Sequence, residues 1–433
     1  MDIRQAEQYF RTCAPGALTS PDDARAAFAA LGVPESPKKA PAGVRFVGVA
    51  GTAGKTAVAS MEAAILAKAG FTCGLYRAGH APLAERITVN GAAVTAAELA
   101  AAAQKLSALA VQPTRAAAEL AAACACFSAA GCDFAVVELS DTLLAQFLPE
   151  MPVCAITQIG ADGTGHSPER AARIAASVLR RGCVAVTTPS QPKAALQELI
   201  VAAGKAECEL IVPEAEDVTA RKARRLENHM DYGGYEATLP LVGRHSAENA
   251  AVAVEVALAL WRKGFEISDE AILAGMPQVL AAGGPVLLRR RPYLLADPCH
   301  NPLQAAALAR LLREAEFEHV AVIAGLSACE APEAFFAALE TGFIPEGEKD
   351  EKNQMPGMSE NAVDKLYLFT PEGEEALAAE AALEAARFHF DAQRCESFAA
   401  CWDKAAAEGA EGIIVLGGDA ACRAARHHVA KKR

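Results

Sequence analysis

The sequence has little of several features that mark specialised classes of protein. Aromatic residues make up only 6% of its 433 residues, and 41 basic residues stand against 53 acidic ones, so the formal net charge is −12. This balance argues against a protein that binds nucleic acid or an anionic membrane along an extended surface. The apolar runs at 116–130 and 247–260 contain glutamates, so neither is expected to span a membrane. Any phosphate-binding site should therefore be local.

The chain also lacks a C-x-x-C pair, although it contains 13 cysteines. Scattered thiols without such spacing are typical of a reduced, cytoplasmic protein. Cys124, Cys126 and Cys132 lie in one alanine-rich stretch with no histidine nearby. We interpret these three residues as core packing rather than as a metal site.

Short β-rich runs alternate with longer Ala/Leu stretches at helical spacing, which predicts an α/β fold with largely parallel sheets. The expected strands are 45–49, 134–139, 154–159 and 184–187, then 293–296, 319–324, 365–369 and 412–416, with a helix over 303–315. A Gly/Pro/Arg-rich stretch at 276–292 and the chain length predict two domains, residues 1–290 and 291–433. The polar residues 342–364 are expected to form a mobile surface loop.

One segment carries a clear chemical signal. Residues 44–56, V-R-F-V-G-V-A-G-T-A-G-K-T, predict a strand and a glycine-rich turn, followed by a helix over 57–69. A helix N-terminus behind glycines presents unpaired N–H groups to an anion, while Lys55 adds positive charge for the phosphates and Thr56 a hydroxyl for Mg²⁺. The alternative is a tight turn with an exposed lysine. The expected nucleotide-binding residues are Gly51, Thr52, Ala53, Gly54, Lys55 and Thr56.

Three further segments follow this phosphate loop. G-L-Y at 74–76 precedes E-R-I-T-V-N-G at 85–91, L-P-L-V-G-R-H-S-A-E-N-A occupies 239–250, and D-P-C-H-N-P occupies 297–302. In this order the four motifs resemble those of the folylpolyglutamate synthase/dihydrofolate synthase family of Mur-type ATP-dependent ligases. Residues 5–10 and 22–32 are similar to the leading helices of that family, so the resemblance covers nearly the whole chain.

The resemblance implies an N-terminal P-loop ATPase domain with a parallel-type sheet and a smaller C-terminal Rossmann-like domain that closes over the nucleotide. In that family a carboxylate attacks the γ-phosphate of ATP, and the amino group of glutamate then displaces phosphate from the acyl phosphate. The implied cofactors are ATP and Mg²⁺, and the implied substrates are ATP, L-glutamate and a folate-like acid. We expect a cytoplasmic monomer that binds neither nucleic acid nor membrane.

The resemblance also assigns roles to single residues. Glu138, at the end of an expected strand, matches the Mg²⁺-binding glutamate of the family, and the carboxyl end of such a strand faces the ligand crevice. Lys55 is the expected catalytic cation. The residues implied on the nucleotide side are Asn249, Asp297, His300 and Asn301, although helix capping would by itself account for Asn249 and the nearby His245.

The chain departs from the family at the second metal. The family histidine of that site falls on Gly163 here, and residues 160–182 contain no lysine that could be carbamylated. Arginine cannot replace that lysine, because its guanidinium does not deprotonate. Asp162 and His166 are the local candidates for a substitute, so we expect any ligase activity to depend on both, with His166 as a catalytic residue.

Two other family elements are altered. The long glycine-rich loop after Glu138 is replaced by a short segment, and the linker arginine is missing from 281–285. Arg289, Arg290 or Arg291 could replace that arginine or could form a solvated face. Three hypotheses therefore stay open: a folate-type ligase, a ligase for another acid, and a nucleotide-binding relative without ligase activity.

Overall fold

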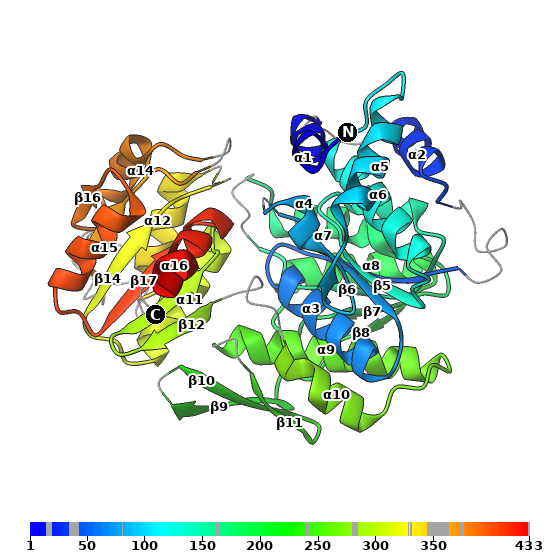
Figure 1. Cartoon of the computed structure of the whole chain (residues 1–433). Helices are drawn as coiled ribbons and strands as arrows, with labels where there is room; N and C mark the ends of the chain where they lie inside the picture. The colour runs from blue at the N-terminus through cyan, green and yellow to red at the C-terminus, as the bar shows by residue number, and fades with distance from the viewer. Residues whose placement is uncertain are drawn as a thin grey trace.

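The computed structural model describes residues 1–13, 20–33, 43–79, 81–160, 165–224, 226–239, 243–278, 285–327, 329, 331–343, 363–372 and 376–431. It contains an eight-stranded, a three-stranded and a six-stranded sheet. Figure 1 shows two α/β domains side by side, the first built on the eight-stranded sheet and the second on the six-stranded sheet. The expected two-domain α/β fold is confirmed.

The eight-stranded sheet has the order β4-β3-β2-β5-β1-β6-β7-β8. All neighbouring pairs are parallel except β2–β3 and β3–β4. The chain runs from β1 to one side and later to the other, so β1 lies at the point where the strand order reverses, which is where such sheets bind ligands. The strands are β1 Arg45–Ala50, β2 Cys73–Tyr76, β3 Ile87–Val89, β4 Ala92–Ala93, β5 Phe134–Glu138, β6 Glu150–Ile156, β7 Val184–Thr187 and β8 Glu209–Ile211.

Alternating side chains of the central strands enter two separate cores. Phe46 of β1 and Val137 of β5 pack in one core, and Val47 and Val136 pack in the other. The first core is covered by α1 Ile3–Thr12, α2 Pro21–Ala30, α5 Ala96–Ser107, α6 Arg115–Ala129, α7 Pro168–Ala175 and α8 Lys193–Ala206. The second core is covered by α3 Lys55–Lys68, α9 Arg244–Arg262, α10 Asp269–Gly275 and the small sheet of β9 Val218–Arg224, β10 Glu227–Tyr232 and β11 Tyr235–Leu239.

Short elements complete the first domain. They are α4 Leu83–Arg86 and the 3₁₀ turns η2 Thr142–Phe147, η3 Ala176–Val178 and η4 Met276–Gln278. Three residues separate the end of β5 from the η2 turn, so the segment after Glu138 is short, as expected. Cys124, Cys126 and Cys132 are buried in the first core, as core packing requires.

The second domain repeats the three-layer arrangement. Its sheet has the order β12-β13-β17-β14-β15-β16, with β12 antiparallel to β13 and the other pairs parallel. One face carries α11 Pro302–Glu314, α12 Pro332–Thr341 and α14 Ala379–Ala386, and the other carries α15 Phe398–Ala407 and α16 Asp419–Lys431. The strands are β12 Val286–Arg290, β13 Tyr293–Asp297, β14 Val320–Ala324, β15 Val363–Leu368, β16 Ala392–Arg394 and β17 Gly412–Leu416.

Several expected boundaries shift. The strand expected at 154–159 is β6, which starts earlier and ends at Ile156, because residues after it turn toward the phosphate loop. Strand β12 already pairs within the second sheet, so residue 290 falls in the β12–β13 hairpin rather than in a linker. Most of the expected loop 342–364 lies outside the described residues. None of the described helices is long and apolar enough to cross a membrane.

Candidate functional site

The phosphate loop leaves β1 at the point of strand reversal and enters α3. Two glycines make its path possible: Gly51 has φ +126° and Gly54 has φ +92°, a region that other residues rarely adopt. A Cβ at Gly54 would lie 2.5 Å from Oδ1 of Asn249, so a side chain there would collide with α9. Asn249 is thereby placed against the loop, on the side predicted from its motif.

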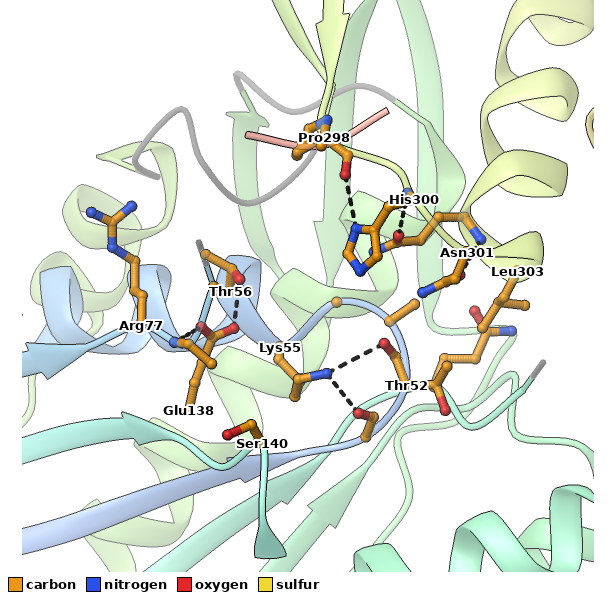
Figure 2. Close-up of a pocket in the computed structure, with 18 of the residues that line it drawn as sticks. Thr52, Lys55, Thr56, Arg77, Glu138, Ser140, Pro298, His300, Asn301 and Leu303 are labelled. Atoms are coloured by element: carbon orange, nitrogen blue, oxygen red, sulfur yellow. Dashed lines mark hydrogen bonds between the residues drawn. The ribbon is translucent and has the colours of Figure 1, made fainter. Parts of the chain in front are cut away.

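Backbone contacts fix the loop to the end of β6. The N–H groups of Thr52 and Ala53 donate to the carbonyl oxygen of Gln158 at 2.9 and 3.1 Å. Nζ of Lys55 lies over the loop and donates to the carbonyl oxygens of Gly51 at 2.8 Å and Thr52 at 3.3 Å (Figure 2). The positive charge of Lys55 is therefore held at the opening of the loop, beside the N-terminus of α3. The lysine and the helix terminus both favour the binding of an anion there.

A carboxylate faces the first turn of α3 from the neighbouring strand. Glu138 is the last residue of β5, and its Oε1 accepts from the Thr56 hydroxyl at 2.5 Å while Oε2 accepts from the backbone N–H of Ala78 at 2.7 Å. Burial raises the pKa of Glu138 and outweighs the attraction of Lys55. A carboxylate in this position is stabilised by a cation.

These residues fit one magnesium ion. Thr56 and Glu138 offer adjacent hard oxygen atoms next to a loop that suits phosphates, and Mg²⁺ commonly takes one or two protein oxygens together with phosphate oxygens and water. Both residues are those expected for the metal. Within the described ranges, no group of three or more His, Cys, Asp or Glu side chains could hold a metal by itself.

The C-terminal domain supplies the opposite wall. Asp297 ends β13, accepts from the N–H of Cys299 at 3.0 Å, and has its pKa raised by burial to about 7. Asn301 caps α11, its Oδ1 accepting from the N–H of Gln304 at 3.0 Å. Both are buried and both line the same cavity as the phosphate loop.

His300 points from this wall toward the phosphate loop (Figure 2). Its Nδ1 lies 3.1 Å from the carbonyl oxygen of Pro298, so Nδ1 carries the proton of the neutral ring and Nε2 is an acceptor. Burial lowers the pKa of His300, and Lys55 lowers it further. His300 is therefore a neutral imidazole near neutral pH.

Helix α16 contributes cations that the sequence analysis missed. Arg423 and Arg426, one turn apart, line the cavity, and Nη1 of Arg423 is buried without a hydrogen-bond partner among the described residues. The expected replacements for the linker arginine do not line the cavity: Arg289 lies over the ring of Trp402 at 5.1 Å, and Arg290 and Arg291 are exposed at the β12–β13 turn. In the sequence, the signal for these cations is the glycine pair Gly417 and Gly418 between β17 and α16, because glycines also stand before the helix of the phosphate loop.

Together these groups line one cavity of about 780 Å³ between the two domains. The two domains are in close contact at the walls of this cavity. A Cβ atom at Gly160 of the first domain would lie 2.7 Å from Leu303 of the second, and one at Gly79 would lie 3.3 Å from Asp419. The expected residues that line it are Gly51, Thr52, Ala53, Gly54, Lys55, Thr56, Glu138, His166, His245, Asn249, Asp297, His300 and Asn301. Asp162 lies outside the described residues, so the expected second-metal pair stays a prediction.

A buried ion-pair network holds the turn after β2, which forms part of the cavity wall. Arg86 donates to both carboxylate oxygens of Glu119 at 2.8 and 2.5 Å, with both side chains 5% exposed or less. Tyr76 and Arg115 donate to the same carboxylate. Two further N–H groups of Arg86 donate to the carbonyl oxygens of Arg77 and Ala81, which fixes the turn after β2 beside Glu138.

Comparison with known proteins places this site in context. No protein-family model matches the chain. A probable bifunctional folylpolyglutamate synthase/dihydropteroate synthase of Halobacterium salinarum is 28% identical over 322 residues, which are 69% of this chain and 38% of that protein. A protein of the same name from Haloferax volcanii is 26% identical over 306 residues. The chain thus spans little more than a third of these curated relatives.

Solved structures agree over the full length. Mycobacterium tuberculosis folylpolyglutamate synthase complexed with ADP matches with a TM-score of 0.80 at 23% identity, covering 99% of this chain and 98% of the other. The bifunctional folylpolyglutamate synthase/dihydrofolate synthase of Yersinia pestis complexed with AMPPNP and Mn ion matches with a TM-score of 0.75 at 23% identity, covering 100% of this chain and 98% of the other. The chain is therefore similar in sequence to these folylpolyglutamate synthases and has the two-domain fold of the solved structures.

Proposed function

We propose that the protein is an ATP- and Mg²⁺-dependent ligase that joins L-glutamate to a folate-type carboxylic acid through an acyl phosphate. The observation that carries this proposal is the Thr56–Glu138 pair at the foot of the phosphate loop, inside a cavity completed by Asp297, His300 and Asn301 of the second domain. The similar structures support it, since the Mycobacterium tuberculosis structure holds ADP, the Yersinia pestis structure holds AMPPNP and Mn, and a further bifunctional folylpolyglutamate synthase/dihydrofolate synthase structure holds Mn, AMPPNP and L-glutamate.

The phosphate loop would hold the triphosphate. Lys55 Nζ would exchange its two backbone carbonyls for phosphate oxygens, and charge-assisted contacts of this kind are stronger than neutral ones. Thr56 and Glu138 would hold Mg²⁺, which would supply positive charge to neutralise the phosphates. Asn249 keeps the loop in shape by filling the space beside Gly54.

The reaction then proceeds in two steps. A carboxylate oxygen of the acid attacks the γ-phosphorus of ATP, the bond to the β–γ bridging oxygen breaks, and ADP leaves. The amino nitrogen of glutamate next attacks the acyl carbon, the bond to phosphate breaks, and the amine loses a proton. Neutral His300 has an acceptor nitrogen directed at this space, so we assign it contact with the reacting groups from the C-terminal side.

One observation favours a second candidate, a nucleotide-binding protein without ligase activity. A short η2 turn stands where the resembled family carries the longer loop that shapes its site. Such a protein would bind ATP at Gly51–Thr56 and would not turn it over.

Phosphate release separates the two candidates. The purified protein is incubated with MgATP and a panel of pteroates and folates, each with and without L-glutamate. A ligase releases phosphate only when acid and glutamate are both present, and Lys55→Ala abolishes the release. ATP binding without glutamate-dependent phosphate release from any acid of the panel would refute folate ligation and support the second candidate.

A further inference from the structure

An arginine stands beside the Thr56–Glu138 pair that no motif assigns. Arg77 follows β2 directly and lines the cavity. Its Nη2 donates to the carbonyl oxygen of Glu85 at 2.5 Å, whereas its Nε is buried and has no hydrogen-bond partner among the described residues. The guanidinium is thus anchored at one end only, and its charge is not consumed by an ion pair within 4 Å in that part of the chain.

The electrostatic surroundings place this charge between the two domains. Burial lowers the pKa of Arg77, while the carboxylates of Glu138 and Asp419 attract its guanidinium. Asp419 belongs to α16 of the second domain and reaches the turn at Gly79. Figure 2 shows Arg77 and Lys55 on opposite sides of the Thr56–Glu138 pair. Arg77 and Lys55 thus both line the cavity, and the Arg77 guanidinium is turned away from the Thr56–Glu138 pair and held there, among the described residues, through Nη2 alone.

The reaction needs such a charge. A carboxylate and a γ-phosphate are both anions, and bringing them together requires positive charge where they meet. The family uses a second metal, but the residues described around this cavity do not form a site for one. An arginine remains charged at any physiological pH, and its planar N–H groups match phosphoryl oxygens.

We propose that Arg77 is a catalytic residue that contacts the phosphoryl group during transfer and supplies the charge that a second metal would supply. This assignment rests on the proposed function. As the γ-phosphorus passes from the oxygen of ADP to the oxygen of the carboxylate, the N–H groups of Arg77 bind the phosphoryl oxygens. No proton or electron moves to or from the guanidinium.

A transition-state mimic tests the assignment without a known acid. MgADP with aluminium fluoride imitates a phosphoryl group in transfer, and such mimics bind far more tightly than ground-state ligands. Calorimetric titration with MgADP, with and without aluminium fluoride, is performed on wild type, Arg77→Gln, Arg77→Lys and a control, Arg181→Gln, whose side chain is 81% exposed. Circular dichroism checks that each variant folds.

We expect Arg77→Gln to lose about 10²–10³-fold in affinity for the mimic and at most about 3-fold for MgADP alone. Arg77→Lys should recover part of the loss, and Arg181→Gln should behave like wild type. Equal affinity of Arg77→Gln and wild type for the mimic would overturn the assignment, as would a loss in His166→Ala with none in Arg77→Gln. If binding of the mimic depends on Arg77 but no acid of the panel supports phosphate release, folate ligation would be refuted and the assignment of Arg77 would stand.

Discussion

Removal of a single buried carboxyl group should stabilise the N-terminal domain. Glu62 lies in α3, is 0% exposed, and neither of its carboxyl oxygens has a hydrogen-bond partner among the described residues. Burial raises its pKa to about 8, and the Glu62 carboxylate adds to the effect of burial in raising the pKa of the Cys73 thiol on β2. We predict that Glu62→Met, which keeps the length of the side chain and removes its ionisation, increases the free energy of unfolding.

The size of the effect follows from proton linkage. The pKa of Glu62 is about 8 in the folded state against an ordinary value of 4.5. Below the ordinary value both states are protonated, and the group contributes no pH dependence. As pH rises toward 8, only the unfolded state releases the proton, so stability falls by about 1.4 kcal/mol per pH unit, which amounts to about 3 kcal/mol at pH 7.

Urea unfolding at pH 5, 6, 7 and 8 measures this difference. Trp261 lies on α9, which packs against α3, and replacing Trp402 by Phe leaves Trp261 as the single fluorescent tryptophan. The gap between Glu62→Met and the parent should widen with pH, while Glu236→Gln, at an exposed glutamate, should leave stability unchanged. A gap that stays constant from pH 5 to pH 8 would show that Glu62 is not held in its neutral form.

Three further predictions concern the cavity and its walls. Lys55→Ala should weaken MgATP binding by about 1.5–3 kcal/mol in calorimetric titration, since a charge-assisted phosphate contact is lost; an unchanged affinity would make the loop purely structural. A non-hydrolysable ATP analogue should reduce the radius of gyration in X-ray scattering, because both domains line one cavity, and His300→Ala should weaken its binding; unchanged dimensions together with full affinity would remove the C-terminal domain from the site. Glu119→Ala should lower the free energy of unfolding by about 3–5 kcal/mol, because Arg86 is left as an unpaired buried charge; a loss below about 1 kcal/mol would contradict that reasoning.

Contiguous signals in the sequence predicted much of the fold and part of the site. The turn at 51–56 could be predicted because strand, glycines and helix follow one another directly in the sequence. In the structure all six of its residues line the cavity. Short continuous β-rich runs located β1, β5, β13 and β17 to within a residue or two, since strands covered on both faces are apolar along their whole length. Glu138 and His300 were singled out because they match motifs of the resembled family, since a position at the end of a strand or the start of a helix would not by itself assign them a role.

Other residues could not be found in this way. Arg77, Arg423 and Arg426 are single arginines without a motif, and their importance depends on two domains meeting at one cavity. The ion pair of Arg86 with Glu119 joins residues 33 positions apart. Burial of Glu62 could not be predicted either, because a single glutamate in an apolar helix is usually solvated, whereas the packing of α3 buries this one completely.

The most direct test of the central claim follows oxygen atoms. The acid that supports phosphate release is labelled with ¹⁸O in its carboxylate and incubated with MgATP and L-glutamate, and the released phosphate is analysed by mass spectrometry. Attack of the carboxylate on the γ-phosphorus requires that one labelled oxygen leaves with each phosphate. We predict this transfer in the wild-type protein. Phosphate released without the label would show that ATP is hydrolysed by water, and the account of the cavity as the site of an acyl-phosphate ligase would be wrong.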